Sequence, residues 1–130
     1  MGLIFSAPKL IYWSSDLGFK DNNMPQLHEK VCIACLPDAE PASADEIQEF
    51  IGNSDWRFIE DDGVPQISRK YEFDNFEQAL AFTNMVAEIA EEEGHHPKII
   101  TEWGSVSVLW WSHKIKNIHV NDLILAARCD

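Results

Sequence analysis

The chain has 130 residues, with 10 Lys and Arg against 22 Asp and Glu, so its formal net charge is −12 at pH 7. This length fits one domain, and an apolar fraction of 45% is sufficient for a hydrophobic core. The negative charge argues against direct binding of DNA or RNA and against docking on an anionic membrane, because both require clustered Lys and Arg. A small molecule or a protein is therefore the expected partner.

Cysteine usage and hydropathy indicate an intracellular protein. Three cysteines are too few for a disulfide framework, and the longest apolar run, residues 106–111, is too short to span a bilayer. We therefore expect a cytoplasmic location, with the nucleus as an alternative, and no membrane span. The first residues fit the loose pattern for myristoylation at Gly2, but an unmodified tail is the favoured interpretation.

The chain is predicted to have an N-terminal extension at residues 1–42 and one domain at residues 43–130. Four prolines and the lack of a sustained hydrophobic period predict that the extension is partly irregular. The domain begins with a helix, because Ser-Ala-Asp-Glu at 43–46 forms a capping box and apolar residues follow at helical spacing. Strands at 56–59 and 66–73, joined by Asp-Asp-Gly at 61–63, then predict a hairpin.

A second helix of about 19 residues is predicted to start near Asp74, whose spacing to Glu77 is like that of a capping box. Gly94 is suited to end it, because glycine readily adopts the left-handed conformation after a helix. One apolar stripe of this helix is predicted to face the core. Its members are Phe76, Leu80, Thr83, Ala87 and Ala90, widened by Phe82, Val86 and Ile89.

The last part of the chain is predicted to form strands at 98–103 and 106–112 and a final helix capped by Asn121. The second of these strands is apolar on both faces, which indicates cover by helices on one side and by a ligand or second subunit on the other. The order α-β-β-α-β-β-α predicts an α+β two-layer sandwich. In it, a four-stranded antiparallel sheet carries three helices on one face.

Three of the five histidines gather around the second hairpin: His95 and His96 follow the long helix, and His113 ends the last strand. Glu91 lies four residues before His95 and can reach it if the helix persists to that point. Pro97 restricts His96 to extended geometry. Histidine titrates near neutrality, so such a cluster suits proton transfer to and from one substrate. The alternative is that these are only polar residues at a helix exit and a strand end.

A zinc site is the competing interpretation of the same residues. Adjacent histidines rarely ligate one ion, and no third ligand stands at a recognisable spacing from His95 and His96. The pair Cys32-x-x-Cys35 lacks two further ligands, for which His28 and Cys129 are the available candidates. We therefore expect no metal at the histidine cluster and no catalytic role for the cysteines.

The histidine cluster resembles the signature of the pterin-4a-carbinolamine dehydratase family. That signature is an acidic residue, three spacers, His-His-Pro, an aromatic residue, a histidine and an aspartate. Here its members are Glu91, His95, His96, Pro97, Trp103, His113 and Asp122. The likeness runs from about Ser43 to the end of the chain, and it departs from the family where the usual Thr-His is Ser112-His113.

The resemblance implies an enzyme that removes water from 4a-hydroxytetrahydrobiopterin to give the quinonoid dihydropterin. This reaction recycles the cofactor of aromatic amino acid hydroxylases and needs no metal or cofactor of its own. By resemblance, His95 and His113 are candidates for the acid, His96 is a binding residue and a candidate base, and Glu91 orients or tunes His95. The residues expected to support the site are Pro97, Trp103 and Asp122.

The resemblance also implies a homodimer or homotetramer and a second kind of function. Some relatives act as protein-binding modules, either as a dimerisation cofactor of a transcription factor or as an assembly factor for another enzyme. Degenerate relatives tend to lose the histidines, whereas His95, His96 and His113 are all present here. We therefore favour the enzyme, with binding of a protein partner as the alternative.

Overall fold

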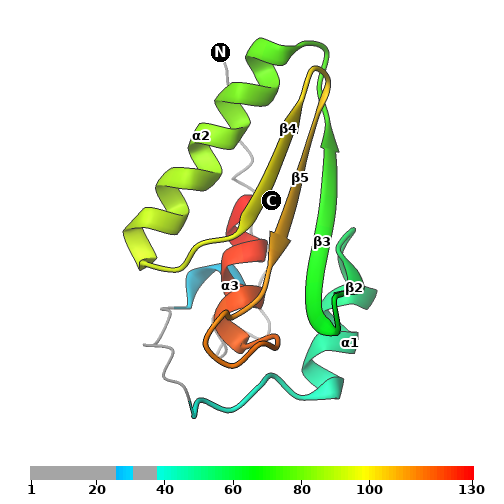
Figure 1. Ribbon diagram of the computed structural model, residues 1–130, viewed down its shortest axis with the longest axis vertical. Coiled ribbons are helices and arrows are strands. Elements are labelled where there is room, and N and C mark those ends of the chain that lie inside the picture. Colours follow the sequence, from blue (N-terminus) through cyan, green and yellow to red (C-terminus); the bar gives the residue numbers. More distant parts are fainter. Residues whose placement is uncertain (1–25, 31–37) are drawn as a thin grey trace.

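The computed structural model of the chain describes residues 26–30 and 38–130 (Figure 1). The predictions about Gly2, Cys32 and Cys35 lie outside these residues. A short 3-10 helix, η2 (Leu27–Glu29), precedes the main elements. These are α1 (Ala44–Gly52), β2 (Arg57–Asp61), β3 (Val64–Glu72), α2 (Phe76–Glu93), β4 (Lys98–Glu102), β5 (Ser105–Trp110) and α3 (Val120–Cys129). The order α-β-β-α-β-β-α is as predicted.

The four strands form one antiparallel sheet in the order β2-β3-β5-β4 (Figure 1). Both predicted hairpins are present, and pairing of β3 with β5 joins them. The first hairpin turns at Asp62 and Gly63, with φ angles of 54° and 79°. Positive φ at both central residues is typical of a tight turn whose twist matches that of the strands.

The helices cover one face of the sheet, which confirms the predicted α+β class. Ile67 is directly opposite Trp110 in the β3–β5 register, so both side chains point to the same face. Both are fully buried, together with Val86 of α2 and Leu125 of α3. Ile47 of α1 belongs to the same core. Burial of this face is the main source of stability, because apolar surface contributes roughly 25 cal/mol per Å² removed from water.

The helix starts show how local chemistry fixes the elements. In α1, Ser43 Oγ accepts from the Glu46 amide at 3.1 Å, and Glu46 Oε1 accepts from the Ser43 amide at 2.8 Å. This is the predicted capping box. In α2 the cap lies one residue later than predicted, because Asn75 Oδ1 accepts from the Gln78 amide at 2.8 Å. Gly94 ends α2 with a φ of 64°, as its sequence position predicts.

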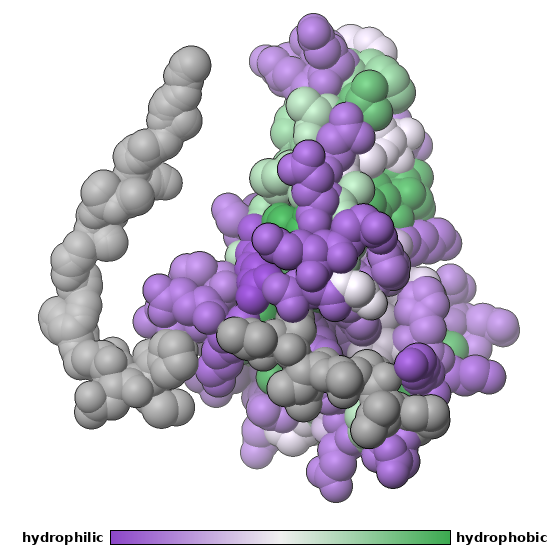
Figure 2. All heavy atoms as spheres, turned by 90° about the vertical axis from the view of Figure 1, so that its left-hand side faces the viewer, coloured by the Kyte–Doolittle hydropathy of each residue, from purple (hydrophilic) through white to green (hydrophobic). Residues whose placement is uncertain are grey.

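The predicted apolar stripe of α2 is wrong in its first half. Phe76 and Leu80 are 46% and 44% exposed, whereas Ala79, Val86 and Ala90 are buried. The small side chains of Ala79 and Ala90 let the helix approach the sheet closely, so the larger residues at its start face outward. Figure 2 looks onto this side and shows apolar patches between hydrophilic residues in the upper part of the molecule, with mostly hydrophilic surface below.

The segment between β5 and α3 also differs from its prediction. β5 ends at Trp110, and Ser112 forms an isolated bridge with Asn117, so His113 lies in an exposed loop rather than in a strand. The cap of α3 is His119, whose Nδ1 accepts from the Asn121 amide at 3.0 Å, and the prediction of Asn121 as cap is wrong. Histidine is an uncommon cap, so the sequence pattern favoured the asparagine.

A helix must be long and apolar throughout to span a bilayer. Within the described ranges, none of the helices combines the length and the apolar character needed to cross a membrane.

Candidate active site

A buried carboxylate lies at the centre of the candidate site. Asp122, in the first turn of α3, is 0% exposed. Its Oδ1 accepts from His95 Nε2 at 2.6 Å, and its Oδ2 accepts from Ser112 Oγ at 2.9 Å and from the His119 amide at 2.8 Å. A buried carboxylate needs such donors, because an unpaired charge in the interior is costly. These three bonds therefore compensate the burial of Asp122 and fix its direction.

The carboxylate of Asp122 orients the ring of His95. With Nε2–H donating to Asp122, the other ring nitrogen, Nδ1, makes no hydrogen bond with the described part of the chain. The ring also stacks on Trp110, with centroids 5.8 Å apart and planes 2° from parallel. A carboxylate that fixes one nitrogen sets the tautomer and leaves the other nitrogen available for proton exchange.

The second histidine, His96, forms a different pair. Its Nε2 donates to Glu91 Oε1 at 2.5 Å, and the two side chains are 58% and 77% exposed. The prediction that Glu91 contacts His95 is therefore wrong. The chain leaves the helical path at Gly94, so the spacing of four residues from Glu91 to His95 no longer puts them on one helix face. The residue that orients His95 is Asp122.

The third histidine, His113, is exposed in the loop after β5. Its ring stacks on Trp111, with centroids 4.4 Å apart and planes 3° from parallel. It directly follows Ser112, which donates to Asp122, so the loop that carries His113 is tied to the carboxylate that holds His95. The three histidines thus belong to one region, built from the end of α2, the end of β5 and the start of α3.

Two further predicted residues lie at opposite ends of β4. Pro97 directly precedes β4 and follows His96. Trp103 lies beyond the far end of β4, at the turn to β5, and is 68% exposed. A strand of this length spans roughly 17 Å, so within this chain Trp103 is separated from the histidines.

Sequence reasoning missed two contributors to this site. Ser112 was noted only as a departure from the family pattern, and His119 was not considered. A sequence signal for them does exist. Asp122 stands in the first turn of a helix, three residues after the capping residue His119, and the hydroxyl of Ser112 precedes both. Both residues donate to Asp122, so they position the carboxylate that orients His95.

Within residues 26–30 and 38–130, no group of three His, Cys, Asp or Glu side chains is arranged to hold an ion. Cys129 is buried at the end of α3, and burial raises the pKa of its thiol to about 12. This thiol stays protonated at neutral pH and is a poor nucleophile or ligand there.

Comparison with known proteins agrees with the fold and the motif. The family model for pterin 4 alpha carbinolamine dehydratase matches residues 40–130. A relative from Saccharophagus degradans is 48% identical over 108 residues, covering 82% of this chain and 96% of its own. Another from Syntrophotalea carbinolica is 51% identical with the same coverage, and both bear the provisional name pterin-4-alpha-carbinolamine dehydratase.

A solved structure supports the same assignment. The transcriptional coactivator/pterin dehydratase from Brucella melitensis superposes with a TM-score of 0.62 at 25% identity, over 69% of this chain and 95% of that one. The chain therefore belongs to the pterin 4 alpha carbinolamine dehydratase family.

Proposed function

We propose that the chain catalyses loss of water from 4a-hydroxytetrahydrobiopterin to give the quinonoid dihydropterin. The observation that carries this proposal is the hydrogen bond between buried Asp122 and partly buried His95, whose ring keeps one nitrogen without a partner in the described part of the chain. Family membership supports the substrate class. The three histidines His95, His96 and His113 supply proton donors and acceptors near neutral pH.

The reaction requires two proton movements. The departing hydroxyl on C4a must receive a proton to leave as water, and N5 must lose its proton as its lone pair forms the new double bond to C4a. In this proposal His95 or His113 donates to the hydroxyl, and His96 binds the pterin and accepts from N5. Each positioned acid or base contributes roughly 10²–10⁴-fold to the rate.

The supporting residues act through the histidines. Asp122 fixes the ring of His95 through their hydrogen bond, which is the orienting role that the family resemblance implies for Glu91. Glu91 serves His96 instead, through an exposed pair that contributes little, because water screens it. Pro97 limits the backbone of His96 to extended geometry.

The test is stopped-flow absorbance on freshly generated 4a-hydroxytetrahydropterin, with the spontaneous dehydration as baseline. We expect catalytic amounts of protein to exceed that baseline clearly and His96→Ala to lose most of the acceleration. His28→Ala is the matched control, because it removes an exposed histidine that lies in η2. Folded protein without acceleration, or a His96→Ala variant with normal turnover, would reject the proposed reaction or its site.

A second candidate function is binding of a protein partner. Phe76 and Leu80 expose apolar surface on the outer side of α2, and the similar Brucella melitensis protein is named as a transcriptional coactivator as well as a pterin dehydratase. Contiguous exposed apolar surface favours association with another protein or another copy of the chain. Replacing both residues with Gln should abolish such association without slowing dehydration, as measured by light scattering and stopped flow on the same samples.

A further inference from the structure

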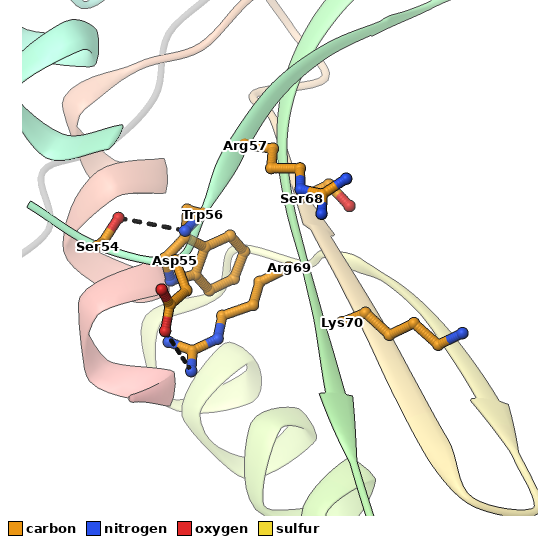
Figure 3. Close-up of a pocket in the computed structure, with 7 residues that line it drawn as sticks. All are labelled: Ser54, Asp55, Trp56, Arg57, Ser68, Arg69 and Lys70. Atoms are coloured by element: carbon orange, nitrogen blue, oxygen red, sulfur yellow. Dashed lines mark hydrogen bonds and ion pairs between the residues drawn. The ribbon is translucent and has the colours of Figure 1, made fainter. Parts of the chain in front are cut away.

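A second polar site lies beside β2 and β3, at the edge of the sheet away from β4. A pocket of about 570 Å³ opens beside the start of β2, and none of its lining residues belongs to the candidate active site. Figure 3 shows the lining, which is formed by Ser54, Asp55, Trp56, Arg57, Ser68, Arg69 and Lys70.

The strand register explains why this pocket exists. The pairing of β2 with β3 ends at Arg57 and Ser68, whereas β3 continues to pair with β5 as far as Glu72. Within the described residues, the edge of β3 beyond Ser68 therefore has no partner strand. The open edge leaves room for a ligand and exposes backbone groups that the sheet does not use.

The charges of the pocket are divided between the two faces of β3. In Figure 3, Arg57, Ser68 and Lys70 lie on one side of the strand, and Asp55 and Arg69 lie on the other. Arg69 is neutralised there, with Nη2 at 3.3 Å from Asp55 Oδ2 and Nη1 at 2.8 Å from Asp130 Oδ1. Alternation along the strand produces this separation, because successive residues point to opposite faces.

The two cations on the side of Ser68, Arg57 and Lys70, have no such neutralising partner among the described residues. Neither Arg57 nor Lys70 forms an ion pair with any described residue, and both are exposed. Ser68 lies directly opposite Arg57 and two positions before Lys70 on the same face. Two unpaired cations and a hydroxyl thus flank one opening in a chain whose net charge is −12.

We propose that Arg57, Ser68 and Lys70 bind a phosphate-class oxyanion, either inorganic phosphate or the phosphoryl group of a small phosphomonoester. A guanidinium presents paired N–H donors that match two oxygens of a phosphate, and an ammonium adds a mobile point charge. The serine hydroxyl donates a further hydrogen bond. This site is independent of the proposed dehydration.

The test is NMR titration of ¹⁵N-labelled protein with inorganic phosphate, glycerol 3-phosphate and acetate, at an ionic strength held constant with NaCl. We expect saturable shifts of the Ser68 and Lys70 amides with phosphate. The double variant Arg57→Gln/Lys70→Gln should bind at least about tenfold more weakly, because it loses two charge-assisted contacts. Lys116→Gln removes the same kind of exposed charge in the loop between β5 and α3 and should bind normally.

The arms of the titration separate the possible ligands. Saturation by both phosphate and glycerol 3-phosphate supports a phosphomonoester site, and saturation by phosphate alone supports a free-phosphate site. Three results would overturn the proposal: no saturable shift, equal binding of acetate, or equal weakening by Lys116→Gln. Because all readouts are binding isotherms, they are unaffected by whether the chain accelerates dehydration.

Discussion

The two ends of α3 each carry a carboxylate that accepts hydrogen bonds from three donor groups, but the donors differ. Asp122 at the start accepts from His95, Ser112 and the His119 amide. Asp130 after the last turn accepts from Trp56 Nε1 at 3.1 Å, Arg69 Nη1 at 2.8 Å and Tyr71 Oη at 2.6 Å. The same chemical group is therefore used twice on one helix.

The difference lies in which donors can serve as general acids or bases. An imidazole such as that of His95 can, whereas the indole of Trp56 and the guanidinium of Arg69 cannot. Burial and the hydrogen bond to Asp130 raise the pKa of Tyr71 far above its usual value, so this donor is also fixed. We infer that Asp122 serves chemistry and Asp130 fastens α3 to β3 and to the residue before β2.

The largest effect is expected from Asp122→Asn. The NH₂ group of an asparagine here would donate to His95 Nε2 instead of accepting from it, which forces the other tautomer of the ring, so turnover should fall roughly 10²–10⁴-fold. Stopped-flow dehydration measures the loss, and circular dichroism checks the fold. Asp130→Asn makes the same change at the other end of α3 and should keep turnover within about twofold. Equal losses in the two variants would contradict the division of roles.

The next effect is on stability at the Asp130 end. Asp130→Ala removes the acceptor for three donors, one of them charged, and should lower the free energy of unfolding by about 2–3 kcal/mol. Urea denaturation provides the measurement. Asp55→Ala is the control, because Asp55 also pairs with Arg69 but is 82% exposed, and should change stability by less than about 0.5 kcal/mol. A similar loss in the free energy of unfolding for both variants would show that Asp130 does not hold α3 against the sheet.

Alkaline pH should loosen the Asp130 end through its neighbour Cys129. Burial raises the pKa of this thiol to about 12 from an ordinary value of 9.0. Below the ordinary value the thiol is protonated in both the folded and the unfolded state, so this group does not make the free energy of unfolding depend on pH. Between the two values only the unfolded state loses the proton, so stability falls as pH rises, by up to about 1.4 kcal/mol per pH unit.

Urea denaturation between pH 8 and 11 measures this loss. Cys129→Ala should flatten the profile, while Tyr71, whose pKa is also raised, maintains a residual slope at the upper end. A profile with the same slope in Cys129→Ala would show that the thiol does not contribute.

The smallest effect is expected from Glu91→Gln. The pair of Glu91 with His96 is mostly exposed, so its loss should slow turnover by no more than about fivefold and cost less than about 0.5 kcal/mol of stability. The comparison with Asp122→Asn tests whether burial determines how much a carboxylate–histidine pair contributes to turnover. A loss as large as that of Asp122→Asn would indicate that Glu91 takes a direct part in the chemistry.

The sequence by itself determined the element order, the two hairpins, the capping box at Ser43 and the end of α2 at Gly94. These depend on neighbours within a few residues, and such short-range rules are readable without a fold. The motif from Glu91 to Asp122 likewise located the candidate site, because its spacing is a linear property of the chain.

Only the tertiary structure decided which partners the functional residues take. The pairing of His95 with Asp122 joins residues 27 positions apart, and the bonds of Asp130 join residues at separations of 59 to 74. Neither propensity nor spacing specifies such contacts, since they depend on how α3 packs against the sheet. The outward turn of Phe76 and the pocket beside Arg57 have the same cause: both follow from packing and strand register, which form only when distant segments meet.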